Sequence, residues 1–230
     1  HQRIKSYKQK LEKQDMVLKE VALIRQRMPH TGGRKLFEML RPALKLNKIK
    51  MGRDALFELL RCKGLLVKKT KRFHITTDSK HFFYKSPNLI QNLDISHAEQ
   101  VFVSDITYIK TDKCHAYLAL VTDAYSKKIM GWCLDDNMKV SMVKDALKMA
   151  HQNCVFNRES LIHHSDRGIQ YCCPDYTSFA ENKKFVMSTT QKYDPYENAI
   201  AERINGILKY EFGLRNTLKD VLTAKKMVQQ

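Results

Sequence analysis

The chain has 230 residues, of which 43% are hydrophobic, and it carries a formal net charge of +17. No apolar run approaches the ~20 residues that a membrane-spanning helix needs, so the sequence predicts no membrane segment. The first residues, HQRIKSYKQK, are charged and no apolar segment follows them, which argues against a signal peptide.

The positive charge is concentrated in the first part of the chain. Residues 1–100 hold 23 Lys and Arg against 9 Asp and Glu, whereas residues 101–230 hold 18 against 15. A basic half beside a nearly neutral half favours a polyanion-binding module joined to a domain with another task. The alternative is a generically basic, soluble protein.

The first 65 residues predict a small helical domain. Residues 4–28 are rich in Lys, Glu, Gln, Leu and Met, and apolar residues recur at helical spacing from Leu36 to Leu44 and again after about Lys50. Two short helices joined by a tight turn, with Lys50 and Arg53 beside them, are typical of a helix-turn-helix that enters the major groove of DNA. A plain helical hairpin that binds nothing is the alternative.

Residues 66–98 are interpreted as a basic linker. Their Lys and Arg residues are interleaved with the aromatic residues Phe73, Phe82, Phe83 and Tyr84. Such a segment can follow a nucleic-acid backbone, and its rings can stack on bases. The alternative is a linker whose aromatic side chains pack into the neighbouring domain, and the sequence leaves stacking undecided.

Residues 99–230 predict an α/β domain. Three β-rich runs are typical of an antiparallel meander, and alternating helices and strands follow them. The strands are expected at residues 101–110, 114–125, 127–135, 160–166 and 185–190, and the helices at residues 139–151, 174–183 and 195–212, the last one opened by Pro195. Three strands, helix, strand, helix, strand, helix is the order of the ribonuclease-H-like fold.

Three acids stand out in this domain. Asp105 lies in the apolar run VFVSDITYI, Asp166 follows the short run LIHH and precedes a Gly turn, and Glu202 lies on the last predicted helix. Sixty residues separate the first two acids and 35 the last two, so each comes from a different element. A carboxylate in mid-strand is unusual unless it has a partner. Each acid alone is compatible with a solvated surface, but together they predict a split metal site.

The cation that suits three carboxylates is a hard divalent one. Mg²⁺ chooses carboxylate oxygens and keeps positions open for substrate phosphate. Two such ions about 3.5–4 Å apart can activate an attacking oxygen and stabilise a leaving one in phosphodiester chemistry. We therefore expect Asp105, Asp166 and Glu202 to hold two Mg²⁺ or Mn²⁺ ions.

The last predicted helix carries a polar stripe. Asn198, Glu202 and Asn205 fall at i, i+4 and i+7, so they share one face. Lys209 lies seven residues beyond Glu202 on the same stripe. We expect the carboxylate to reach the metal, and the two amides and the lysine to reach DNA.

Four motifs, SDITYI, LVTDAYSKKIMGW, HHSDRGIQY and ENAIAERINGILK, resemble the catalytic core of bacterial insertion-sequence transposases encoded by two overlapping reading frames. Those enzymes are similar to retroviral integrases, and the resemblance runs from about residue 30 to residue 215. It implies that Asp105, Asp166 and Glu202 are the catalytic, metal-binding triad. It also implies that Lys209 lies near the terminal phosphate of the DNA.

The resemblance implies a DNA transposase that cleaves element ends and transfers strands. It also implies a homo-oligomer on DNA, located in the bacterial cytoplasm and associated with the nucleoid. A partner segment from the first reading frame is expected as well. The chain departs from the family at Phe102, where Trp is usual, and at Glu197-Asn198, where Asp-Asn is usual, and it ends at Gln230 before an expected Tyr-Asn…Arg-x-His segment. Two alternatives are a structure-specific nuclease of the same fold and a non-catalytic DNA-binding remnant.

Overall fold

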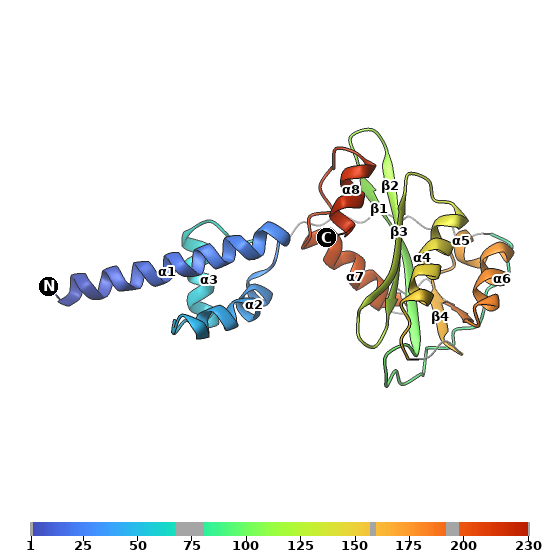
Figure 1. Ribbon diagram of the computed structural model, residues 1–230, viewed down its shortest axis with the longest axis horizontal. Coiled ribbons are helices and arrows are strands. Elements are labelled where there is room, and N and C mark those ends of the chain that lie inside the picture. Colours follow the sequence, from blue (N-terminus) through green and yellow to red (C-terminus); the bar gives the residue numbers. More distant parts are fainter. Residues whose placement is uncertain (1, 68–80, 157–159, 192–197, 230) are drawn as a thin grey trace. The chain divides into compact units, whose positions relative to one another are not determined.

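A computed structural model describes residues 2–67, 81–156, 160–191 and 198–229 of the chain (Figure 1). The chain divides into two compact units. The first comprises residues 1–73 together with Leu208–Gly213, and the second comprises residues 74–207 and 214–230. None of the described helices is both long and apolar enough to cross a membrane.

The first unit is built from three helices, α1 (Gln2–Arg27), α2 (Gly33–Leu46) and α3 (Arg53–Cys62). Apolar residues spaced three and four apart turn one stripe of each helix inward. The resulting core contains Val17, Val21, Leu36, Leu40, Leu44, Ile49, Leu56, Leu59 and Leu60. The predicted helices are confirmed, although α3 begins at Arg53 rather than near Lys50, because Gly52 is still extended.

The second unit contains a five-stranded sheet in the order β3-β2-β1-β4-β5. The strands are β1 (Val101–Lys110), β2 (His115–Asp123), β3 (Ile129–Asp135), β4 (Ile162–Ser165) and β5 (Val186–Thr189). The first three form the predicted antiparallel meander, whereas β4 pairs parallel with β1 and β5 parallel with β4. The long strand β1 is therefore central, with neighbours on both sides.

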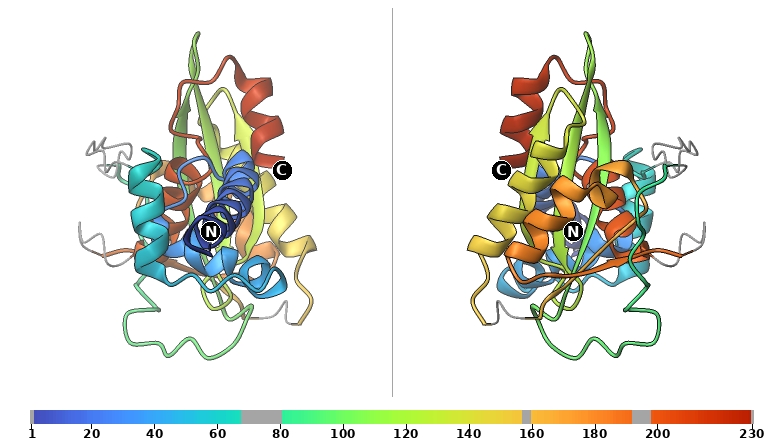
Figure 2. Two further views of the ribbon diagram at one scale, coloured as in Figure 1. Left: turned by 90° about the vertical axis from the view of Figure 1, so that its left-hand side faces the viewer. Right: turned by 90° about the vertical axis from the view of Figure 1, so that its right-hand side faces the viewer.

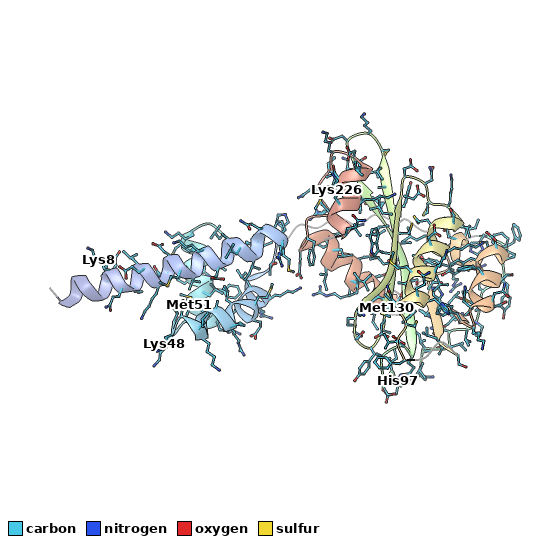
Figure 3. All side chains as sticks on the ribbon, viewed as in Figure 1. Lys8, Lys48, Met51, His97, Met130 and Lys226 are labelled. Carbon is cyan, nitrogen blue, oxygen red and sulfur yellow. The ribbon has the colours of Figure 1, made fainter. Side chains whose placement is uncertain are left out.

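Helices cover both faces of this sheet (Figure 1, Figure 2). α4 (Val140–Gln152), α5 (Ile169–Cys172) and α6 (Pro174–Asn182) lie on one face, and α7 (Ala199–Tyr210) and α8 (Val221–Gln229) on the other. The side chains between the sheet and α4 to α6 form the larger core, which includes Phe102, Met130, Leu147, Leu161, Tyr176 and Phe185. Met130, on β3, is labelled in Figure 3. This is the ribonuclease-H-like arrangement that the sequence predicts.

The structure differs from the sequence prediction at several element ends. The short helix α5 and the last helix α8 were not expected, and β4 ends at Ser165, one residue before Asp166. The last predicted helix is seen as α7, and Pro195, its expected first residue, lies outside the described residues.

From residue 81 onwards the predicted linker runs along β5, the edge strand of the sheet. Thr189 Oγ1 donates to the Ser86 backbone oxygen at 2.7 Å, and the Leu89 backbone N–H donates to Ser188 Oγ at 2.9 Å. After these bonds, Ile90, Leu93 and Ile95 of the segment pack against the apolar cluster that contains Val101 and Val103 of β1. The segment is therefore attached to the edge strand through the side-chain hydroxyls of Ser188 and Thr189. Phe73 lies outside the described residues.

Candidate active site

Two of the predicted acids lie where the pairing between two neighbouring strands ends. β1 and β4 are parallel, and their last paired residues are Ser104 and Ser165. Asp105 and Asp166 each follow one of these serines directly. Because adjacent strands lie about 4.8 Å apart, the register brings the two carboxylates close enough to repel each other.

Both acids belong to the face of the sheet that α7 covers. Val103 of β1 and Ile162 of β4 pack in one apolar cluster with Ala201 of α7. Side chains alternate between faces along a strand, and Asp105 stands two residues beyond Val103. Asp166 stands four residues beyond Ile162 and continues the same alternation past the end of β4.

The carboxylate of Asp105 is held by two donors. Asn205 Nδ2 on α7 donates to its Oδ2 at 2.7 Å, and the backbone N–H of Ile106 donates to its Oδ1 at 2.8 Å. Burial, followed by the negative charge of Asp166, raises the pKa of Asp105 to about 7, and Glu202 adds a smaller push in the same direction. The two hydrogen bonds oppose this rise without cancelling it. Such a shift is expected of carboxylates that share one site.

The other two acids lie in the turn after β4 and on α7. Asp166 Oδ1 accepts the backbone N–H of Gly168 at 3.0 Å, which fixes it in the turn after β4. Glu202 is exposed in the first turn of α7, and partial desolvation raises its pKa. In the part of the chain that the structure describes, no three His, Cys, Asp or Glu side chains form a ready metal cluster. Glu202 thus raises the pKa of Asp105 through its charge, although the described side chains do not form a ready metal-binding cluster.

The comparison with known families bears directly on this region. A family model described as the integrase core domain matches residues 96–195. Residues 96–195 are therefore similar to an integrase core domain. The matched residues include Asp105 and Asp166, whereas Glu202 lies beyond them.

The chain is also similar to proteins of bacterial insertion elements. It is 36% identical over 173 residues to the insertion element IS600 uncharacterized 31 kDa protein of Shigella sonnei, a match that covers 75% of this chain and 63% of the relative. It is 35% identical over 156 residues to transposase InsF for insertion sequence IS3fB of Escherichia coli K12, covering 66% and 53%. The chain thus spans between about half and two thirds of the length of these curated relatives.

Among solved structures, the catalytic domain of Mos1 mariner transposase is similar with a TM-score of 0.47 at 10% identity, covering 57% of this chain and 68% of that one. The HTLV-2 integrase catalytic core domain in complex with magnesium is similar with a TM-score of 0.40 at 18% identity, covering 49% and 68%.

The two asparagines that were predicted to contact DNA are instead buried in the second unit. Asn198 Nδ2 donates to the backbone oxygen of Ser104 at 3.1 Å, and Asn205 donates to Asp105. Their amide groups are directed at β1, so the geometry favours a positioning role over DNA contact. They tie α7 to β1 and orient the Asp105 carboxylate.

The three cations predicted to bind DNA lie elsewhere. Lys209 lies in the last turn of α7, within the stretch Leu208–Gly213 that is grouped with the first unit. Lys50 and Arg53 are exposed on the helical unit near the start of α3, and Arg53 forms an ion pair with Asp54 at 3.0 Å. Contact between these cations and DNA stays a prediction.

A buried polar network on the opposite face of β1 was missed by the sequence analysis. His163 Nε2 lies 2.8 Å from Ser104 Oγ and 3.0 Å from Tyr176 Oη. Burial, followed by the neighbouring His164, lowers the pKa of His163 to about 3, so its imidazole is neutral at physiological pH. The signal that could have found this network is strand alternation, which places Ser104 on the face opposite Asp105.

Proposed function

We propose that this chain is the catalytic part of a DNA transposase, which cleaves the ends of an insertion element and joins them to target DNA. The observation that carries the proposal is the position of Asp105. It lies on the central strand beside the strand end of Asp166, and Glu202 on α7 acts on it electrostatically. Similarity to the InsF transposase over 66% of this chain supports the same reaction.

In this proposal Asp105, Asp166 and Glu202 are the catalytic residues. Asn205 orients Asp105 through α7, and the Gly168 backbone N–H fixes Asp166 in its turn. The exposed Glu202 side chain has the rotamer freedom to approach the other two when a ligand binds. The triad would thus combine two pre-positioned carboxylates with one that completes the site.

The donor set fits a hard divalent cation. Three carboxylates from three elements suit Mg²⁺ or Mn²⁺. The pKa of Asp105 is raised by burial first and by the charge of Asp166 second, and a bound cation would favour its ionised form. When bound, two such ions would activate the attacking water or 3′-hydroxyl and stabilise the leaving oxygen. The protein's own contribution is to hold the Asp105 and Asp166 carboxylates in place through Asn205, Ile106 and Gly168.

The remaining parts of the proposal concern DNA and partners. The helical unit, assigned to residues 1–65, would hold DNA through Lys50 and Arg53; Figure 3 shows neighbouring Lys48 projecting outward from this unit. Residues 66–98 would link it to the catalytic core of residues 99–230, with Lys209 near the terminal phosphate. We further propose that the protein works as an oligomer on DNA, together with a first-reading-frame segment, in the bacterial cytoplasm.

A strand-transfer assay tests this function. Labelled element-end DNA is incubated with a plasmid target and Mg²⁺ or Mn²⁺, and joined products are counted. We expect metal-dependent joining that is lost in Glu202→Gln and retained in Glu181→Gln, an exposed glutamate on α6. Asp105→Asn should fail in the same way, whereas Asp175→Asn, which removes an exposed partner of Lys144, should not.

Each other outcome has a defined meaning. Joining by Glu202→Gln at the rate of the unaltered chain would refute the role assigned to Glu202. Cleavage of the end without any joining would favour a structure-specific nuclease. If end DNA is bound in a salt-sensitive way but neither cut nor joined, even after a first-reading-frame segment is added, the chain is a DNA-binding remnant.

A further inference from the structure

The segment that follows residue 81 exposes two aromatic rings. Side-chain exposure alternates along HFFYK: Phe82 and Tyr84 are 92% and 78% exposed, whereas His81, Phe83 and Lys85 between them are partly buried. This alternation is that of an extended chain with one face against the protein. The outer face is entirely aromatic, which is costly in water unless something covers it.

The inner face contacts the rest of the protein at two points, and Lys85 braces the segment internally. His81 Nε2 lies 2.8 Å from the Arg167 backbone oxygen, and Phe83 packs against the main core. Lys85 Nζ donates to the backbone oxygens of His81 and Phe83 at 2.8 and 3.2 Å. The ring of Phe83 also supports that of Phe82, at 4.6 Å between centroids. The outer rings are therefore exposed on a fixed backbone.

These anchors place the segment beside the turn that carries Asp166. Arg167 is the next residue, and its Nε donates to the Thr190 backbone oxygen at 2.7 Å. Lys85, Arg167 and Asp166 all act electrostatically on the thiol of Cys172, so both cations lie close to this turn. In Figure 1 and Figure 2 the segment continues, in green, to a loop below the sheet.

We propose that Phe82 and Tyr84 form an aromatic step that stacks on an unpaired base of a DNA end held beside the Asp166 turn. The inference rests on the proposed function and names the form of DNA that the site accepts. Alternate residues of an extended chain lie about 6.6 Å apart, since each residue advances ~3.3 Å. Stacked bases are about 3.4 Å apart, so one base between the two rings contacts both.

DNA fits this surface better than a protein partner does. The chain carries a net charge of +17. Lys85 belongs to the inner face of the same segment, and the backbone of Arg167 contacts His81 next to the aromatic step. A sugar–phosphate backbone is drawn to such cations while its bases turn to the rings, which is how single strands are bound without sequence preference. Strand cleavage beside Asp166 also requires the end to be exposed near the site.

A binding experiment without catalysis tests the aromatic step. Fluorescence anisotropy in EDTA compares two labelled element ends, one fully paired and one with three unpaired nucleotides at the tip. We expect the unaltered chain to prefer the unpaired tip by about 5- to 100-fold, the range that aromatic–base stacking supplies. Phe82→Ala and Tyr84→Ala should each lose most of this preference, and Phe82→Trp should keep it.

The matched control is Phe156→Ala, because Phe156 is 79% exposed and lies on the loop after α4. It should keep the preference of the unaltered chain. Equal binding of the two ends by the unaltered chain would overturn the aromatic step while leaving the proposed function intact. A preference that survives in both alanine variants, or a change of oligomeric state in them, would overturn it too. Absence of binding to either DNA would overturn the proposed function as well.

Discussion

Acidification should destabilise the second unit through His163, which is fully buried between β1 and α6. Its folded pKa is about 3, depressed by burial first and by His164 second. The other titratable groups that contact it are Tyr171 and Tyr176, whose own pKa values are raised by burial, so both stay neutral. The folded state therefore keeps His163 neutral where the unfolded chain would protonate it.

The sign and size follow from linkage. A base whose folded pKa is depressed loses stability as pH falls below the unfolded pKa, because only the unfolded state takes up the proton. With an unfolded pKa of about 6.5, pH 5 lies 1.5 units below, and each unit corresponds to ~1.4 kcal/mol. His163 should therefore cost about 2 kcal/mol of unfolding free energy at pH 5 and almost nothing at pH 7.5.

Urea unfolding followed by tryptophan fluorescence measures this change, because the only tryptophan, Trp132, lies on β3 of the second unit. The unaltered chain is compared with His163→Gln at pH 7.5 and pH 5. The glutamine offers hydrogen bonds to Ser104 and Tyr176 but does not titrate. The unaltered chain should lose about 2 kcal/mol more than the variant on acidification. Parallel losses would refute the reasoning, and exposed His97→Gln should match the unaltered chain.

Three further predictions concern packing and positioning. In Gly131→Ala the new Cβ would overlap the backbone oxygen of Ala146 on α4, so the free energy of unfolding should fall by about 3 kcal/mol. In Gly206→Ala the new Cβ meets open space on a helix, so the free energy of unfolding should rise by ~0.5–1 kcal/mol. The same fluorescence assay measures both changes. The buried carboxylate of Glu99 accepts hydrogen bonds from the backbone N–H groups of Val155 and Phe156. Glu99→Ala removes this acceptor and should lower the free energy of unfolding by about 2–3 kcal/mol in the same assay. Asn205→Ala should slow metal-dependent joining about 10- to 100-fold with unchanged DNA affinity, measured by strand transfer and anisotropy; equal joining rates would refute its positioning role.

The fold could be predicted from the sequence because its signals are local. Alternating β-branched residues predict β1 to β3, and helical spacing of leucines predicts α2 and α3. The sequence does not decide whether the aromatic residues of the linker stack on bases. In a segment without regular structure, which side chains are exposed depends on tertiary contacts that the sequence does not reveal. Phe83 is partly buried, while Phe82 and Tyr84 are not.

The positions of the acids in sequence could be predicted, but the contacts that hold them could not. Asn205 shares a helical face with Glu202, and that face turns out to lie against β1, which the helix alone does not reveal. An asparagine on a polar stripe is compatible with DNA contact until the partner strand is known. Likewise, His163 and Ser104 are 59 positions apart, and only the parallel pairing of β1 with β4 joins them.

The same pairing explains why the candidate site lies where it does. At β1 the sheet changes from antiparallel neighbours on one side to parallel neighbours on the other. The chain therefore leaves β1 and β4 in different directions at their carboxyl ends, and such a point opens a space for ligands in α/β sheets. Asp166 directly follows the carboxyl end of β4, and Asp105 lies on β1 just past the last residue that pairs with β4. A carboxylate buried there with a pKa of about 7 opposes folding, so its position is better explained by a bound cation than by stability.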